Sequence, residues 1–267
     1  MKTSVQVLSQ DERHRVHEES LTILEKTGVL VETPLGRRIL RDAGARVDDI
    51  NRIVKFPRAL VESSLELVTR DFVLSSRRPG PDLVMNGGGS TLCPDGGGTM
   101  VLDSTTGQRR PATYDDWEKI TKLADALDEI GVYWCQVVPS ERGKTLGDSV
   151  DYFCRVFRGF SKHIQAGPEA EEEASWFTEI LQTVFGSRDD IKKYHPVSSL
   201  ICPQSPLSID HKYTEACLAL KGWNIPVAIM PMPLMGCSAP ASMIATVIQG
   251  NCEVLATLCL LQANEPG

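Results

Sequence analysis

Uncharged polar and sulfur-containing side chains gather where four predicted strands end. The strands are expected at residues 132–138, 162–166, 197–202 and 226–230. In proteins that alternate strands and helices, ligands bind at the carboxyl ends of parallel strands. The candidate substrate-binding residues are Tyr133, Gln136, His163, Gln165, Cys202, Gln204 and Met232. These side chains can hydrogen-bond and pack around a small molecule, but they include no carboxylate pair for general acid–base catalysis.

A metal site is the main alternative for two of these residues. His163 and Cys202 lie on neighbouring predicted strands and could hold a zinc ion that activates a thiol substrate. A lone histidine and a lone cysteine are more often packing and hydrogen-bonding residues, so we predict no bound metal. His14 and His17 share a helix face, but the charged residues around them are typical of a solvated surface.

Glycine is concentrated in two short runs, Asn86–Gly89 and Asp95–Gly98. Neither run has the G-K-[ST] ending or the G-x-G-x-x-G spacing of a phosphate-binding loop. Hairpin turns that need a positive φ are the simpler interpretation.

Residues 113–267 are predicted to form the strand–helix units that position the candidate side chains. Helices are expected at 113–127, 146–159, 168–185, 209–222 and 239–264. In the helix over 168–185, apolar residues recur with helical spacing at Ala170, Ala174, Phe177, Leu181 and Val184. Successive strands begin 30, 35 and 29 residues apart, which favours right-handed crossovers and a parallel sheet.

Two α/β architectures fit this repeat, an open doubly wound sheet and a (β/α)8 TIM-type barrel. A barrel has roughly twice as many units as the four found here. The sequence ends at Asn264-Glu-Pro-Gly267, a helix-ending signal where a fifth strand should begin. We therefore expect about the first half of a longer barrel.

The first part of the chain, residues 1–112, has a less regular pattern and is expected to be a mixed α+β lead-in. Its predicted helices cover 9–26, 33–44 and 57–68, and its predicted strands cover 53–56, 72–76 and short stretches near 83 and 100. The helix at 9–26 begins with a capping box, Ser9-Gln-Asp-Glu12.

Composition and charge narrow the class of protein further. Apolar residues make up 42% and charged residues 24% of the 267 residues, as in an ordinary globular protein. The net charge of −7 argues against general nucleic-acid binding, which needs a basic surface. The eight cysteines include no C-x-x-C pair, and charges occupy the N-terminal region where a signal peptide would be apolar. We therefore predict reduced thiols and a cytoplasmic protein.

One stretch, residues 243–261, is apolar enough to suggest a membrane span. Gln249, Asn251 and Glu253 lie at its centre, where a bilayer would disfavour them, so we predict a buried helix. Glu253 is expected to make a structural hydrogen bond or an interface pair rather than to act in catalysis. Because this helix is apolar nearly all round, we expect another subunit or the N-terminal lead-in to cover it, and we predict a homo-oligomer.

Several segments carry specific motifs. They include Leu102-Asp-Ser-Thr-Thr-Gly-Gln-Arg-Arg-Pro111, Lys162-His163, Leu200-Ile-Cys-Pro-Gln-Ser-Pro-Leu207, Ile225-Pro-Val, Met235-Gly-Cys-Ser-Ala-Pro240, Gln249-Gly-Asn-Cys-Glu-Val-Leu-Ala256 and Pro266-Gly267. Together they closely resemble the N-terminal portion of the trimethylamine methyltransferase family, and the resemblance covers nearly the whole chain.

The resemblance implies a (β/α)8 barrel that moves a methyl group from a methylated amine to the cobalt of a corrinoid protein. The amine would be trimethylamine or a quaternary amine such as glycine betaine, and the role would lie in methylamine metabolism and methanogenesis. The corrinoid is carried by the partner protein, so the chain itself binds no cofactor directly. Founding members use a pyrrolysine that lies beyond the segment matching Gly267. We therefore place the catalytic residue outside this sequence.

The implied substrate suggests roles for the candidate residues. A trimethylammonium group is held best by aromatic faces, and Tyr133 and Trp134 have opposite facings, so at most one of them points into the barrel. Gln136, His163, Gln165 and Gln204 could bind a carboxylate tail. The alternatives to this function are the zinc-dependent barrel enzyme and a truncated, non-catalytic product.

Overall fold

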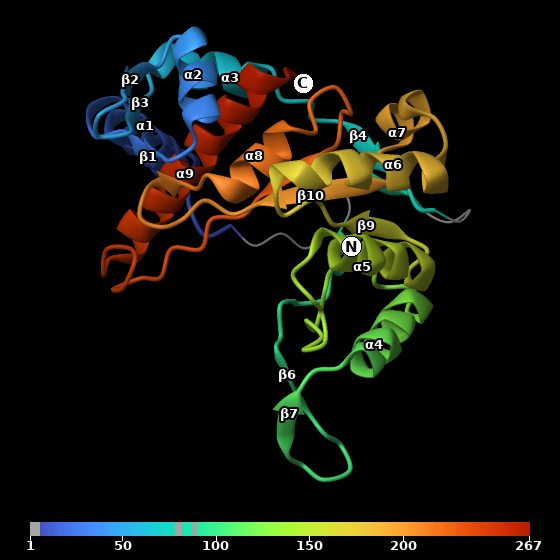
Figure 1. Ribbon diagram of the computed structural model, residues 1–267. Coiled ribbons are helices and arrows are strands. Elements are labelled where there is room, and N and C mark those ends of the chain that lie inside the picture. The colour runs from blue at the N-terminus through green and yellow to red at the C-terminus, as the bar shows by residue number, and fades with distance from the viewer. Residues whose placement is uncertain (1–5, 78–81, 87–89) are drawn as a thin grey trace. The chain divides into compact units, whose positions relative to one another are not determined.

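The computed structural model describes residues 6–77, 82–86 and 90–267 (Figure 1). The chain packs as two compact units, each described here by itself. The first unit contains the residues up to Val68 together with Ile201–Leu218 and Ile229–Gly267. The second contains Thr69–Leu200 and Ala219–Ala228. The packing thus divides near residue 68, whereas the sequence pattern changes near 112, because the C-terminal helix shares a core with the N-terminal helices.

The first unit combines a small mixed sheet with helices. Its strands lie in the order β11-β1-β3-β2, with β11 parallel and β3 antiparallel to β1. The strand bounds are β1 Val29–Val31, β2 Arg46–Asp48, β3 Ile53–Lys55 and β11 Ser208–Ile209. The helix bounds are α1 Gln10–Lys26, α2 Pro34–Asp42, α3 Arg58–Glu66, α8 Lys212–Leu218 and α9 Met243–Asn264. The capping box predicted at the start of α1 is present, since Ser9 and Glu12 exchange hydrogen bonds.

Helix α9 forms the centre of the first unit and lies against α1, α2 and α3 (Figure 1). It begins at Met243 rather than near residue 239. By length and composition it is the one helix among the described residues that could cross a membrane, but half of its most apolar window is buried within the chain. Its buried residues are Gly250, Cys252, Glu253, Leu255, Ala256, Thr257, Cys259 and Leu260. The first turns stay exposed at Met243, Ile244 and Val247.

The second unit is built on the sheet that the sequence predicted. Its strands lie in the order β12-β10-β9-β8, and β8–β9 and β9–β10 are parallel pairs. The bounds are β8 Val132–Tyr133, β9 His163–Gln165, β10 Val197–Ile201 and β12 Val227–Ile229. These strands do not close into a barrel within the described part of the chain. The parallel α/β arrangement is therefore confirmed, whereas the closed barrel is not.

Helices cover one face of this sheet. They are α4 Tyr114–Ala126, α5 Leu146–Gly159, α6 Ala174–Phe185 and α7 Arg188–Tyr194. Helix α6 begins later than predicted because Glu171–Glu173 forms a short 3-10 turn. Helix α7 was not predicted from the sequence, although Ser187 and Asp190 form a capping box at its start. The core between the helices and the sheet is formed by side chains from both. It includes Trp117, Tyr133, Phe153, Phe157, Ile164, Phe177, Leu181 and Val197.

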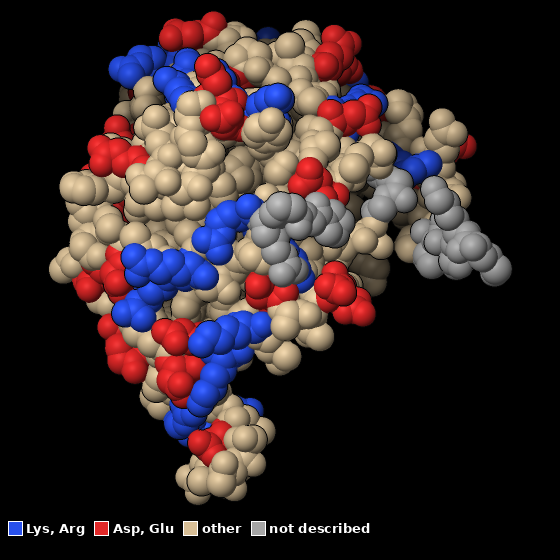
Figure 2. Space-filling view, turned by 90° about the vertical axis from the view of Figure 1, so that its right-hand side faces the viewer, with Lys and Arg blue, Asp and Glu red and all other residues tan. Residues whose placement is uncertain are grey.

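Two hairpins precede the helices of the second unit. Strands β4 Phe72–Leu74 and β5 Leu83–Met85 form one, and β6 Met100–Leu102 and β7 Arg109–Pro111 form the other, which projects from this unit in Figure 1. Figure 2 shows one face of the chain, on which the described basic side chains are interspersed with acidic ones.

Residues 87–89 of the first glycine run lie outside the described residues. The second run does not form the hairpin turn that we predicted, although Gly97 has the expected positive φ, +79°. The segment runs beside the end of β8, where Gly97 N–H donates to the Cys135 carbonyl and Gly98 N–H donates to the Gln136 carbonyl. A Cβ on Gly96 would fall 1.7 Å from the Trp134 indole. Glycine is needed here because the backbone approaches an aromatic ring closely.

Candidate functional site

Side chains alternate between the two faces of the sheet in the second unit, so those on one face pack against the helices and those on the other do not. Tyr133, Ile164 and Val197 are buried in that core, and Cys135 packs against it. Successive residues of an extended chain point to opposite faces, so Trp134, Gln136, His163 and Gln165 point away from the helices. The second sheet face therefore carries four polar or aromatic side chains.

Two glutamines mark the carboxyl end of this face. Gln165 is the last residue of β9, and Gln136 follows the end of β8. Both side chains are partly buried. The Gln136 Oε1 atom is buried and has no hydrogen-bond partner among the described residues. Because a buried amide oxygen without a partner is costly, this atom is suited to accept a hydrogen bond from a bound molecule.

His163 lies at the opposite end of its strand from the one we expected, because it is the first residue of β9. The ring is fully buried, and its Nε2 lies 2.9 Å from the Ser198 hydroxyl. Its Nδ1 has no hydrogen-bond partner among the described residues. Burial disfavours the charged ring and lowers the pKa of His163 to about 4. The imidazole is therefore neutral near pH 7.

Tyr133 occupies the helix-covered core instead of a ligand-facing position. Its hydroxyl accepts a hydrogen bond from Trp117 Nε1 at 3.0 Å and lies 3.1 Å from the Tyr152 hydroxyl. Burial raises the pKa of Tyr133 well above its usual value. The neighbouring Trp134 is partly exposed and is the aromatic residue of this pair on the other face. The sequence established that only one of the two could face a ligand, without deciding which.

Changing Tyr133 to phenylalanine is expected to lower the free energy of unfolding by about 1–3 kcal/mol, because Trp117 Nε1 would lose its hydrogen-bond acceptor in a buried site. Urea unfolding, followed by circular dichroism, measures the change. Tyr114 to phenylalanine is the matched control, since that side chain is only partly buried. Equal stability of the Tyr133 variant and the wild type would contradict the buried pairing.

The remaining candidate residues belong to the first unit. Cys202 follows β10 and is partly buried, and burial raises the pKa of its thiol. Gln204 is exposed, and its backbone forms a pair of hydrogen bonds with Ser208 that closes the loop between β10 and β11. Met232 follows β12 and is 57% exposed. Cys202 is therefore a protonated thiol near neutral pH, and Gln204 and Met232 are accessible to a ligand.

No cluster of possible metal ligands is found among the described residues. They include no group of three or more His, Cys, Asp or Glu side chains that could hold a metal ion. The proposed zinc ligands, His163 and Cys202, belong to different units. All eight cysteines are free thiols in the structure.

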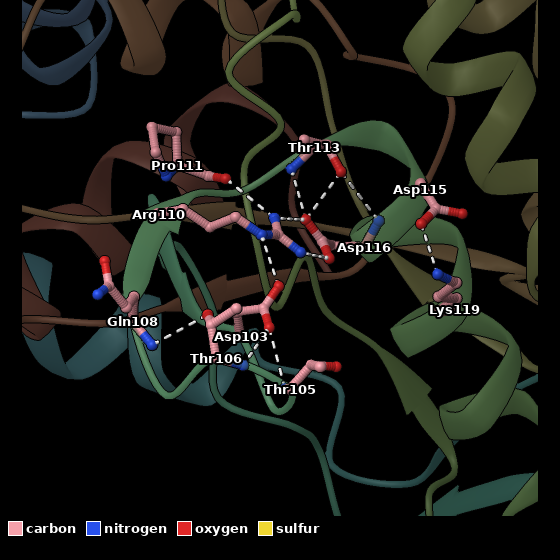
Figure 3. A network of polar contacts seen from close by, with 10 residues as sticks. All are labelled: Asp103, Thr105, Thr106, Gln108, Arg110, Pro111, Thr113, Asp115, Asp116 and Lys119. Carbon is pink, nitrogen blue, oxygen red and sulfur yellow. Dashed lines mark hydrogen bonds and ion pairs between the residues drawn. The ribbon is translucent and has the colours of Figure 1, made fainter.

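The motif at 102–111 forms a polar network that joins the β6–β7 hairpin to α4 (Figure 3). The Arg110 guanidinium binds both carboxylate oxygens of Asp116, at 2.6 and 2.9 Å, and donates to Asp103 at 3.3 Å. Asp103 accepts hydrogen bonds from the backbone of Thr105 and Thr106 in the hairpin turn. Arg110 and Thr113 hold the pKa of Asp116 well below its usual range. The network is internally satisfied, which indicates a structural role.

Comparison with known proteins places the chain in a family. A model described as trimethylamine methyltransferase matches residues 1–267, the whole chain. The chain belongs to this family. The family resemblance that we inferred from the sequence is therefore confirmed.

Individual relatives agree with the family match. A trimethylamine methyltransferase of Desulfitobacterium hafniense (strain DSM 10664 / DCB-2) is 29% identical over 97% of the chain and 52% of its own length. A glycine betaine methyltransferase of D. hafniense (strain Y51) is 28% identical over 98% of the chain and 54% of its own length. A trimethylamine methyltransferase of Methanosarcina barkeri (strain Fusaro / DSM 804) is 26% identical over 96% of the chain and 53% of its own length. The chain thus spans about half the length of the curated relatives it matches.

A solved structure supports the fold. The crystal structure of the hydroxylamine MtmB complex matches with a TM-score of 0.51 and 15% sequence identity. The match covers 90% of the chain and 53% of that structure. At this identity the similarity concerns the fold alone.

Proposed function

We propose that the protein transfers a methyl group from a methylated amine to the cobalt of a corrinoid carried by a partner protein. The family match over residues 1–267 carries this proposal. The relatives named for trimethylamine and for glycine betaine define the two substrates to test. We further propose that the parallel sheet of the second unit is part of a (β/α)8 barrel, because MtmB has a similar fold over 90% of the chain.

The residues at the sheet ends would bind and orient the amine. The corrinoid would supply the nucleophilic cobalt that takes the methyl group, and these residues would hold the N-methyl group in line with it. The indole of Trp134 suits a trimethylammonium head, which cannot donate an N–H hydrogen bond. The amide nitrogens of Gln165 and Gln136 can donate to a carboxylate tail, whereas the unpartnered Oε1 of Gln136 needs a separate hydrogen-bond donor. His163, Cys202, Gln204 and Met232 remain candidates for further contacts, whereas the buried position of Tyr133 leaves it outside the proposed set.

The test is methyl transfer with the purified protein, a reduced corrinoid protein and each amine in turn. We expect the Co(I) absorbance to disappear with trimethylamine or with glycine betaine. Omission of the amine is the control for spontaneous oxidation. Failure with both amines under conditions where a known family member is active would contradict the proposed function.

Changing Gln165 to leucine should affect the two amines differently. With glycine betaine, loss of an amide donor to the carboxylate is expected to lower kcat/KM by about tenfold or more. With trimethylamine, which has no carboxylate, the change should be less than about threefold. Steady-state rates for both substrates measure the difference. The matched control is Gln182 to leucine on α6, outside the sheet face, and an equal loss for both amines would argue against a carboxylate contact.

Two further properties belong to this proposal. A cytoplasmic location is supported by the eight free thiols. A homo-oligomer is supported by exposed apolar side chains at the start of α9 and in the segment before it. They are Met232, Leu234, Met235, Met243, Ile244 and Val247. Sedimentation velocity of the purified protein tests the oligomer, which a monomer at micromolar concentration would contradict.

A further inference from the structure

Glu253 is a fully buried carboxyl group in the middle of α9. It accepts hydrogen bonds from the Ser205 hydroxyl at 2.8 Å, the Leu207 backbone N–H at 3.0 Å and the Gln249 amide at 3.1 Å. None of the ion pairs formed by the described residues includes it. The structural hydrogen bond expected from the sequence is therefore confirmed, and neutral donors supply it instead of a cation.

The same turn of α9 also holds a second loop. The Gln249 amide nitrogen, besides donating to Glu253, donates to the Ser238 carbonyl at 2.9 Å. A Cβ on the buried Gly250 would lie 3.4 Å from Pro233 and 3.8 Å from Pro231, so the segment before the Ser238 turn packs directly on the helix. One helical turn thus contacts two loops that are far apart in sequence.

Both loops follow strands of the parallel sheet. The β10 loop, residues 202–207, carries Cys202 and Gln204, and the β12 loop, residues 230–240, carries Met232. The loops themselves, and the turn of α9 that holds them, all lie in the first unit. Three candidate substrate-binding residues are therefore carried by segments that Glu253 and Gln249 hold.

We propose that Glu253 and Gln249 are positioning residues that fix the β10 and β12 loops in a single arrangement for substrate binding. The expected effect on turnover rests on the proposed function. The coupling of the β10 and β12 loops is inferred from the hydrogen bonds of Glu253 and Gln249 alone. Leu207 has a φ of +48°, a left-handed conformation that side-chain-bearing residues rarely adopt. Its N–H bond to Glu253 fixes the loop in that conformation.

The Glu253→Gln variant distinguishes a positioning role of Glu253 from a role of its negative charge. If the negative charge of Glu253 attracted a cationic amine, Glu253→Gln would lose that effect. A glutamine can instead preserve the network, because its Oε1 accepts from Leu207 and Gln249 while its Nε2 donates to the Ser205 hydroxyl. Glu253→Leu keeps the approximate volume but removes every acceptor.

Hydrogen–deuterium exchange of the two loops tests the coupling without any assay of function. In Glu253→Leu we expect amides of both loops to exchange about tenfold faster or more, whereas Glu253→Gln should stay within about threefold of the wild type. Gln249→Leu should accelerate exchange in 234–239 and leave 204–208 near the wild-type rate. The control is Asn251→Leu, since Asn251 donates to Ser20 of α1 instead of to either loop. Unchanged exchange of both loops in Glu253→Leu and Gln249→Leu would overturn the proposal.

Methyl transfer then tests the consequence for turnover. We expect Glu253→Leu to lose about tenfold or more in kcat/KM, with rescue by Glu253→Gln to within about threefold of the wild type. Equal loss in both variants would overturn the positioning role in favour of the charge. A wild-type protein that is inactive with both amines would contradict only the proposed function, because loop exchange is measured separately.

Discussion

Replacing Phe177 with alanine is expected to lower the free energy of unfolding by about 3–5 kcal/mol. Phe177 lies on α6 and is fully buried. Its ring centroid is 5.0 Å from that of Phe153 and 6.5 Å from that of Phe157, both on α5. Truncation would remove these contacts and leave a cavity that two packed helices cannot close by small movements. Urea unfolding of the wild type and the variant, followed by circular dichroism, gives the difference.

The neighbouring Trp176 provides a matched control. It is also a large aromatic residue of α6, but it is 48% exposed. Trp176→Ala is therefore expected to change the free energy of unfolding much less, by about 1 kcal/mol or less. If the two variants lost similar stability, the assignment of the buried face of α6 would be wrong.

The buried face of α6 could be predicted because helical periodicity is local information. The apolar positions chosen from the sequence include Ala174, Phe177 and Leu181, and all three are buried. Pro168 suggested a helix start, but Ala170 has an extended backbone and α6 begins at Ala174. The spacing of the strands likewise predicted the parallel sheet, because each crossover needs a helix of limited length.

The partner of an apolar segment could not be predicted in the same way. The sequence showed that α9 is apolar nearly all round, and we expected another subunit or the N-terminal lead-in to cover it. The structure packs α9 on α1, α2 and α3, and it pairs β1 with the distant β11. A hydrophobic pattern sets the period of an element, whereas long-range packing decides which surface covers it.

The candidate site shows the same division between local and long-range information. The alternation of Tyr133 and Trp134 followed from the sequence, but the side covered by helices depends on α4 and α5. His163 was grouped with the residues at the carboxyl end of the sheet, although the expected strand over 162–166 already placed it near the amino end. In the structure β9 is His163–Gln165, so Gln165 lies at the carboxyl end and His163 at the other. The strand was thus located correctly from the sequence, and the end at which His163 lies was not.

Lowering the pH from 7 to 4 is expected to destabilise the wild type by about 3 kcal/mol more than it destabilises His163→Gln. His163 is fully buried, and burial lowers its pKa from 6.5 to about 4. Between these two values the unfolded chain binds a proton at this position and the folded chain does not. Stability from this residue is therefore fully present above pH 6.5 and is lost as the pH falls toward 4.

The difference between matched variants isolates this effect from the carboxyl groups that titrate in the same range. Urea unfolding of the wild type, His163→Gln and His14→Gln at pH 7, 5.5 and 4 supplies the comparison. His14→Gln, on the exposed surface of α1, is the matched control for the substitution itself. His163→Gln should have a shallower dependence below pH 6.5, even if the loss of the Ser198 contact lowers its stability at every pH. Parallel curves for all three proteins would mean that the His163 ring accepts a proton in the folded state as readily as in the unfolded chain, and the buried neutral imidazole would be ruled out.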